Sequence, residues 1–273
     1  MSLTSRSPVI GIFDSGVGGL TVARAVLHEL PAARLIYLAD TAHVPYGPRP
    51  LAQVRDFALQ IIGFLYEQGA EVVVMGCNMS SASGARDAGI ELYGKPLYEV
   101  IRPGAAAAQA ATRNGKVGVI ATQGTVNSGA YERALHATGV AQVYQQACPL
   151  FVPLVERGQD DGPEVEAAVA EYLTPLRDAG VDTLIFGCTH YPFLGEAIAR
   201  FLGPEVTLID PGTFTACEVA AQFATDQPPT PPDSHRFFSS GDPESLRREG
   251  ERLLGFPLHK VEWVGVPVEK SIG

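Results

Sequence analysis

Two cysteines in this chain lie in nearly identical surroundings and belong to a residue type that can do acid–base chemistry. Cys77 follows an apolar run in GAEVVVMGCN, residues 69–78, and Cys188 follows one in GVDTLIFGCT, residues 180–189. A thiol exchanges protons when its pKa lies near the working pH. Two thiols on opposite sides of one carbon would invert a stereocentre. Alternatively, they would form a nucleophile with a resolving thiol, or soft metal ligands with His190.

A free cysteine is most often a small buried hydrophobe, and we expect this for Cys148 and Cys217. Cys77 and Cys188 differ, because each follows a glycine and precedes polar residues that we expect to open a helix. The positive end of a helix stabilises a thiolate. We therefore interpret Cys77 and Cys188 as functional, with His190 close enough in sequence to exchange a proton with Cys188.

The two cysteine segments are part of an internal repeat. They are offset by 111 residues, while VIGIFDS (9–15) and KVGVIATQ (116–123) are offset by 107. In the second pair, a strand with an internal glycine runs into a hydroxyl residue, Ser15 or Thr122. The similar offsets predict two related halves, each with a cysteine at the carboxyl end of a parallel strand, where ligands bind in such sheets.

The elements that position these residues follow from hydrophobic periodicity. Short apolar runs alternate with longer segments of helical period, which predicts an α/β protein. We expect two pseudo-symmetric domains, each with a mostly parallel sheet flanked by helices, and an active site in the cleft between them. The expected domains are residues 1–97 plus 212–273, whose C-terminal tail packs back, and residues 98–211.

The expected strands are 9–13, 35–38, 72–75, 96–101, 117–120, 183–186, 206–209, 236–239 and 261–264. The expected helices are 20–30, 51–65, 103–113, 124–137, 163–179, 192–202, 212–225 and 243–254. Four prolines in DQPPTPPD, residues 226–233, predict an extended connector.

Composition excludes several classes of protein. Hydrophobic residues make up 46% of the 273 residues, so a large core can form and disorder is excluded over most of the length. The formal net charge of −10 argues against a nucleic-acid partner. We find no membrane-spanning run, no signal sequence and no CxxC pair. A cytoplasmic protein with free thiols is the expectation.

Other polar motifs follow predicted strands. Asp14 and Ser15, in IFDSGVGGLT, are either a helix N-cap or a carboxylate beside a thiol, with Ser15 and the glycine N–H groups binding a substrate carboxylate. The same stretch lacks the third glycine of a dinucleotide fingerprint, which disfavours a nicotinamide cofactor. Tyr46 and Gly47 lie in the loop ADTAHVPYG. Glu156, in PLFVPLVERG, is either a helix-start acid or a member of the site.

Together, the segments FDSGVGGLTV, ADTAHVPYG, GCN, GTVNSGAYERAL, CPLFVPLVERG and FGCTHYPFL resemble the glutamate racemases of the cofactor-independent aspartate/glutamate racemase superfamily. The resemblance runs in order from Val9 to Gly255. It implies racemisation of L-glutamate to D-glutamate for peptidoglycan in the bacterial cytoplasm. It also implies no pyridoxal phosphate, metal or nicotinamide, and usually a homodimer.

The resemblance matches Cys77 and Cys188 to the two catalytic cysteines. It matches Asp14 and His190 to the groups that assist them, and Glu156 to an acid on the Cys188 side. In that family the Asn-Cys half acts on the D enantiomer and the Cys-Thr-His half on the L enantiomer. We assign substrate contacts to Asp14, Ser15, Tyr46, Gly47, Asn78, Met79, Thr122, Thr189 and His190.

Two residues depart from the family pattern. Met79 stands where the family typically has threonine, and Pro211 stands in IDPG where the family usually has serine. A thioether cannot donate a hydrogen bond, so either a backbone N–H or Ser80 replaces that contact, or substrate choice differs and another acidic amino acid such as aspartate is used. Two further alternatives are a thiol hydrolase using Cys188 and His190, and a binding protein without catalysis.

Overall fold

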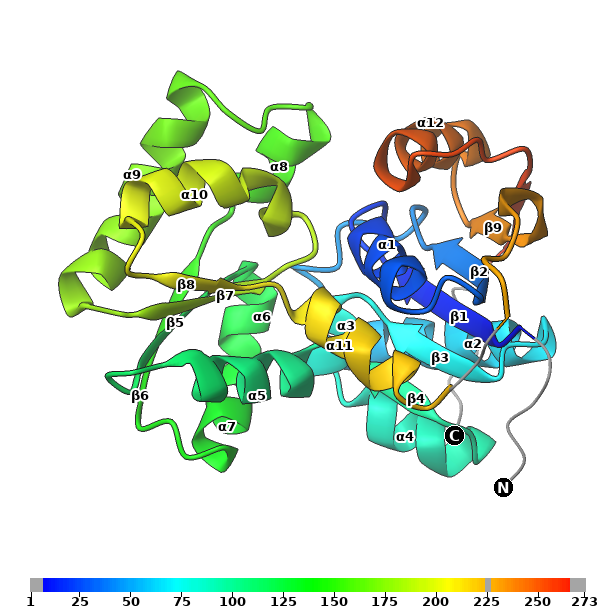
Figure 1. Ribbon diagram of the computed structural model, residues 1–273, viewed down its shortest axis with the longest axis horizontal. Helices are drawn as coiled ribbons and strands as arrows, with labels where there is room; N and C mark the ends of the chain where they lie inside the picture. Colours follow the sequence, from blue (N-terminus) through cyan, green and yellow to red (C-terminus); the bar gives the residue numbers. More distant parts are fainter. Residues whose placement is uncertain (1–6, 224–226, 266–273) are drawn as a thin grey trace. The chain divides into compact units, whose positions relative to one another are not determined.

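Two parallel β-sheets organise the residues that the computed structural model describes, 7–223 and 227–265. The chain groups into two units, one with the residues up to Val100 and from Thr215 onward, the other Ile101–Phe214. Each unit has its own sheet with helices packed on it (Figure 1). The predicted α/β class with parallel sheets is confirmed. Within the described ranges, no helix is both long and apolar enough to cross a membrane.

The first unit contains a six-stranded sheet of order β10-β9-β2-β1-β3-β4, in which every neighbouring pair is parallel. Its strands are β1 (Val9–Asp14), β2 (Arg34–Ala39), β3 (Val72–Met75), β4 (Leu97–Glu99), β9 (Arg236–Ser239) and β10 (Val261–Trp263). Its helices are α1 (Leu20–Glu29), α2 (Leu51–Glu67), α3 (Asn78–Ala82), α4 (Ala85–Tyr93) and α12 (Pro243–Leu254), with the 3-10 helix η2 (Pro232–Ser234). Since β1 is central and right-handed crossovers lead to β2 and then back to β3, α1 and α2 cover opposite faces.

The second unit contains a four-stranded parallel sheet of order β6-β5-β7-β8. Its strands are β5 (Lys116–Ala121), β6 (Gln142–Ala147), β7 (Thr183–Gly187) and β8 (Thr207–Ile209). Its helices are α5 (Ile101–Ala111), α6 (Gln123–Ser128), α7 (Ala130–Ala137), α8 (Phe151–Glu156), α9 (Pro163–Ala179) and α10 (Gly195–Leu202), with the 3-10 helix η1 (Tyr191–Leu194). Helix α11 (Pro211–Ala220) spans the boundary between the units.

The strands of the two units pair at equivalent positions of the internal repeat. Phe13 of β1 lies opposite Met75 of β3. Adding the two repeat offsets gives Ile120 and Phe186, and these two residues lie opposite each other in β5 and β7. The strand order β2-β1-β3-β4 likewise matches β6-β5-β7-β8. The two halves that the sequence offsets predict therefore also share topology and register.

The structure corrects several predicted elements. The strand expected at 96–101 covers only β4, and Ile101 begins α5 instead. The helix expected at 124–137 is divided at Gly129, whose φ of +63° a helix does not continue through. The helix expected at 192–202 starts as the 3-10 turn η1. Strand β6 and helices α4 and α8 were not predicted from the periodicity.

Two predictions extend onto residues outside the described ranges. The helix expected at 212–225 ends at Ala220, and residues 224–225 are not described. The connector expected at 226–233 begins with such a residue; from 227 it has no regular structure until η2. Beyond it, β9 pairs in parallel with β2, so the C-terminal segment completes the first sheet.

Candidate active site

The carboxyl ends of β1 and β3 bring Asp14 and Cys77 together in the first unit. Phe13 and Met75 are paired across the strands, and the Gly76 N–H donates to the Phe13 carbonyl at 2.9 Å. Helices on opposite faces leave the sheet at this point, where ligands bind in open parallel sheets. In the second unit, the paired Ala121 and Gly187 place the residues that follow them, Thr122 and Cys188, at the equivalent point.

The glycine before each cysteine is required by close strand approach. A Cβ atom on Gly76 would lie 3.2 Å from the Phe13 carbonyl oxygen, and one on Gly187 would lie 2.8 Å from the Ile120 carbonyl oxygen. These two carbonyls occupy equivalent repeat positions. The same packing constraint therefore fixes both Gly-Cys steps at their strand ends.

Cys77 is buried at the start of the short helix α3. Burial and the nearby Asp14 carboxylate raise the pKa of the Cys77 thiol to about 12. The nearby Ser80 and Ser15 oppose this rise in pKa, and the Cys77 thiol donates to Ser15 Oγ at 3.8 Å. Desolvation in this buried position therefore outweighs the stabilisation that the five-residue helix α3 gives to a thiolate.

Asp14 is buried beside this thiol and held by the backbone of the glycine-rich turn. Its Oδ2 accepts a hydrogen bond from the Gly19 N–H at 2.6 Å. A Cβ atom on Gly19 would clash with the Asp14 side chain and lie 2.9 Å from the Tyr37 hydroxyl. That hydroxyl donates to the Gly16 carbonyl at 2.8 Å. The turn GVGG therefore fits closely around the Asp14 carboxylate.

Asp40 organises the loop that follows β2. Its buried carboxylate accepts hydrogen bonds from the Tyr46 hydroxyl at 2.5 Å and the Ser240 hydroxyl at 2.6 Å, and contacts His43 Nδ1 at 2.8 Å. Burial and Asp40 raise the pKa of Tyr46 well above its usual range. Tyr46 is thereby held as a neutral phenol, and the half-buried Gly47 follows it.

Tyr46 belongs to a small buried cluster that includes Cys77. Met79, the second residue of α3, packs in this cluster with them and with Phe57. Its side chain is thus part of the apolar lining beside the thiol. Asn78 precedes it as the first residue of α3 and is buried.

In the second unit, Cys188 has an imidazole as its close neighbour. Cys188 Sγ lies 3.8 Å from His190 Nδ1, and both residues are buried. On the other side of the ring, His190 Nε2 lies 3.7 Å from Glu156 Oε1, which is too long for a direct hydrogen bond. Among the described residues, His190 Nε2 has no hydrogen-bond partner. The arrangement is a line of thiol, imidazole and half-exposed carboxylate.

Two local expectations for this unit are wrong. Thr189 and His190 do not open an α-helix: they form a turn, and the 3-10 helix η1 begins after His190. Glu156 is the last residue of α8, so it is not a helix-start acid.

Thr122 precedes α6, with its Oγ1 3.1 Å from Thr125 Oγ1. Pro211 begins α11, a position at which the missing N–H costs no helical hydrogen bond.

The repeat shows that the two thiols have different neighbouring groups. By the repeat offsets, Asp14 corresponds to Ala121, and His190 corresponds to Met79. A carboxylate thus accompanies Cys77 and an imidazole accompanies Cys188.

The remaining cysteines differ from each other. Cys148 is buried in the core of the second unit, as predicted, and burial raises its pKa. Cys217 lies on α11 and is exposed, so the prediction that it is buried is wrong.

Three residues near the thiol of the first unit were not assigned to the site from the sequence. Ser80 carried a signal only as the residue after Met79. Asp40 directly follows the strand expected at 35–38, in the same loop sequence as Tyr46, and this position after a strand is its only signal. Ser240 gives no local signal, because it lies 200 residues from the Asp40 that it contacts.

Comparisons with known proteins show which family the chain belongs to. The family model described as Asp/Glu/Hydantoin racemase matches residues 10–219. A glutamate racemase of Beutenbergia cavernae is 48% identical over 261 residues, covering 90% of this chain and 89% of the relative. The crystal structure of a glutamate racemase isoform from Bacillus anthracis superposes with a TM-score of 0.89 at 38% identity, covering 97% of this chain and all of the other.

A further crystal structure is that of the Francisella tularensis glutamate racemase in complex with D-glutamate. It superposes with a TM-score of 0.85 at 34% identity and covers 95% of this chain and 98% of that protein. On these matches, the chain belongs to the Asp/Glu/Hydantoin racemase family, and within it to the glutamate racemases, which are isomerases.

Proposed function

We propose that this chain interconverts L-glutamate and D-glutamate, with Cys77 and Cys188 acting on opposite faces of the same α-carbon. The observation that carries the proposal is the equivalent position of the two thiols. Each belongs to a Gly-Cys step at the end of a matching strand, β3 or β7, in sheets of the same order and register. A mechanism with one base would not need the second thiol.

On the Cys77 side, the resting group is a neutral thiol, because burial and Asp14 raise its pKa to about 12. Cys77 would give its proton to the α-carbon as Cys188 removes one from the other face. The thiolate formed at Cys77 would accept hydrogen bonds from Ser80 and Ser15. In the reverse direction, Asp14 would assist removal of the thiol proton.

On the Cys188 side, His190 would take the thiol proton at Nδ1, 3.8 Å from the sulfur. The thiolate then removes the α-proton of the L enantiomer. Glu156, 3.7 Å from Nε2, would stabilise the imidazolium that forms. This assigns the L enantiomer to Cys188 and the D enantiomer to Cys77.

Glutamate is the substrate that we propose, and its carboxylates would contact Ser15, Asn78, Thr122 and Thr189. The D-glutamate complex of the Francisella tularensis protein supports this choice. Aspartate is the alternative, because Met79 places an apolar thioether beside Cys77. Turnover on the two amino acids under the same conditions decides between them: faster turnover of aspartate would contradict our choice.

The test is incubation with L-glutamate in D2O without added cofactor, following optical rotation and α-deuterium. We expect loss of rotation, with deuterium appearing first in the D product and not in the remaining L substrate. Cys77→Ala and Cys188→Ala should each abolish racemisation, while Cys217→Ala, at an exposed cysteine, should not. Early deuterium in both enantiomers, or near-normal turnover by either of the first two variants, would contradict the two-base mechanism.

The contact between Cys188 and His190 is also the arrangement that a thiol hydrolase uses. Such an enzyme would form a covalent acyl adduct on Cys188 and would not need Cys77. An acyl adduct found by mass spectrometry in an active Cys77→Ala variant would favour this second function.

The cellular setting is part of the same proposal. The four cysteines are free thiols, which suits the reducing cytoplasm. D-Glutamate made there would supply peptidoglycan synthesis. We propose that the chain works as a homodimer, which light scattering of the purified protein would test.

A further inference from the structure

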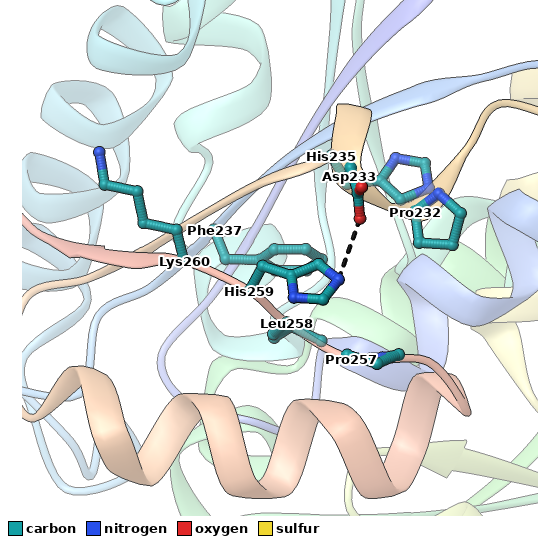
Figure 2. A pocket seen from close by; sticks show the side chains of 8 residues that line it. All are labelled: Pro232, Asp233, His235, Phe237, Pro257, Leu258, His259 and Lys260. Carbon is teal, nitrogen blue, oxygen red and sulfur yellow. Dashed lines mark ion pairs between the residues drawn. The ribbon is translucent and has the colours of Figure 1, made fainter.

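A second concave site lies in the first unit. It is at the amino-terminal ends of the strands, whereas Asp14 and Cys77 are at the carboxyl ends. This cavity of about 320 Å³ lies where the chain enters β9 and β10 (Figure 2). The strands are parallel, so all their amino ends lie on one side of the sheet and all their carboxyl ends lie on the other. The cavity is therefore separate from the cysteine of this unit.

The inner part of the cavity is apolar apart from one imidazole. Phe237 and Leu258 are buried and Pro257 adds a further apolar surface, while His235 is 8% exposed. His235 Nδ1 accepts a hydrogen bond from the Leu35 N–H at 3.1 Å, so its ring proton must be on Nε2. In the described part of the chain, Nε2 has no hydrogen-bond partner. The Nε2–H of this buried side chain is thus a donor that solvent or a ligand in the cavity can satisfy.

The cavity carries no net fixed charge on its inner surface. Burial lowers the pKa of His235 to about 4, so this imidazole is neutral at physiological pH. At the rim, His259 Nε2 and Asp233 Oδ1 pair at 3.0 Å. Figure 2 shows the Lys260 ammonium directed away from the other lining side chains. A charged ligand would therefore lose its hydration without gaining a counter-charge inside.

We propose that this cavity binds a small, flat, uncharged ring that carries a hydrogen-bond acceptor, such as an aromatic amide or lactam. The ring packs against Phe237 and Leu258, and its carbonyl accepts the His235 Nε2–H. The cavity volume is at the lower end of the range of small-molecule sites, about 300–1,000 Å³. The site is independent of the glutamate chemistry.

Three ligands of similar shape test the proposal on the unmodified protein by NMR titration. Benzamide has the ring and a neutral acceptor, benzoate has the ring and a charge, and toluene has the ring alone. We expect benzamide to bind most tightly and to shift the His235 Nε2–H resonance and the Leu258 amide. Saturating D-glutamate should not displace it. Tighter binding of benzoate or of toluene, or displacement by D-glutamate, would overturn the proposal.

A substitution pair isolates the donor. His235→Phe keeps a ring but removes the N–H, and it should weaken benzamide binding about fivefold, the effect of one neutral hydrogen bond. His28→Phe makes the same change at an exposed position on α1 and should leave binding unchanged. Equal binding by wild-type protein and a folded His235→Phe variant would refute the assignment. Should His235→Phe fail to fold, the ligand series on the unmodified protein still decides.

Discussion

Replacing Asp14 with asparagine tests whether this carboxylate sets the protonation state of Cys77. After burial, Asp14 is the largest cause of the raised pKa of Cys77, about 12. At pH 7.5, about one such thiol in 30,000 is ionised. Asparagine has nearly the same shape, and its oxygen can still accept the Gly19 N–H that lies 2.6 Å from Asp14 Oδ2. The substitution therefore removes mainly the charge.

The expected effect on thiol reactivity follows from two opposing trends. A neighbouring charge shifts a pKa by about one to three units, so its removal increases the thiolate fraction about 10- to 1,000-fold. Each thiolate is also a weaker nucleophile as its pKa falls, with a Brønsted coefficient of about 0.5. The alkylation rate of Cys77 should thus rise about 3- to 30-fold. Racemisation should fall, because the assisting carboxylate is gone.

The assay is labelling with iodoacetamide at pH 7.5, followed residue by residue with peptide mass spectrometry. The exposed Cys217 in the same sample is the internal reference, and it should react much faster than Cys77 in the wild-type protein. Asp87→Asn, at an exposed carboxylate on α4, is the matched control and should change neither rate. Cys77 labelling that is unchanged or slower in Asp14→Asn would refute the electrostatic argument.

Two further predictions concern stability. Gly187→Ala forces a Cβ atom to within 2.8 Å of the Ile120 carbonyl oxygen and should lower the free energy of unfolding by about 1–3 kcal/mol. Gly195→Ala, in α10, places a Cβ atom in ordinary contact with Phe186 at 3.8 Å and should raise this free energy by about 0.5 kcal/mol. Urea denaturation that fails to separate the two variants would contradict the packing argument. On folding, the pKa of His235 falls from 6.5 to about 4, so the unfolded chain binds a proton more readily than the folded protein does. The stability that depends on a neutral imidazole is therefore complete above pH 6.5 and is lost as the pH falls toward 4. We expect this loss in the free energy of unfolding to be about 2 kcal/mol, allowing for partial solvent screening. The same urea experiment across this range should show a smaller loss in His235→Gln, and an identical pH profile would contradict the assignment.

Much of the fold could be predicted because the strands are buried on both faces. The residues of β3 are all buried and apolar, and its bounds match the prediction at 72–75. The bounds of β9, α9 and α12 also match. The repeat predicted two related halves, and the structure adds that Ile120 pairs with Phe186 as Phe13 pairs with Met75.

What was missed lacked a hydrophobic signal. Strand β6 (QVYQQA) is at the edge of its sheet and only half-buried or exposed, so it has no apolar run. Helix α4 has only Ala85 and Gly89 buried. The high pKa of Cys77 depends on how completely its surroundings exclude water, which the sequence pattern around a strand end does not reveal.

The order in which the ribosome makes this chain has a consequence for the loop after β2. The Asp40 carboxylate, which holds Tyr46, needs the Ser240 hydroxyl 200 residues later. The whole second unit is synthesised in between. Nascent chains that end before Ser240 therefore contain both cysteines but leave Asp40 without one of its donors. The hydrogen bonds of this loop are therefore complete only after residue 240 has been synthesised, and chains truncated before it lack one donor to the Asp40 carboxylate.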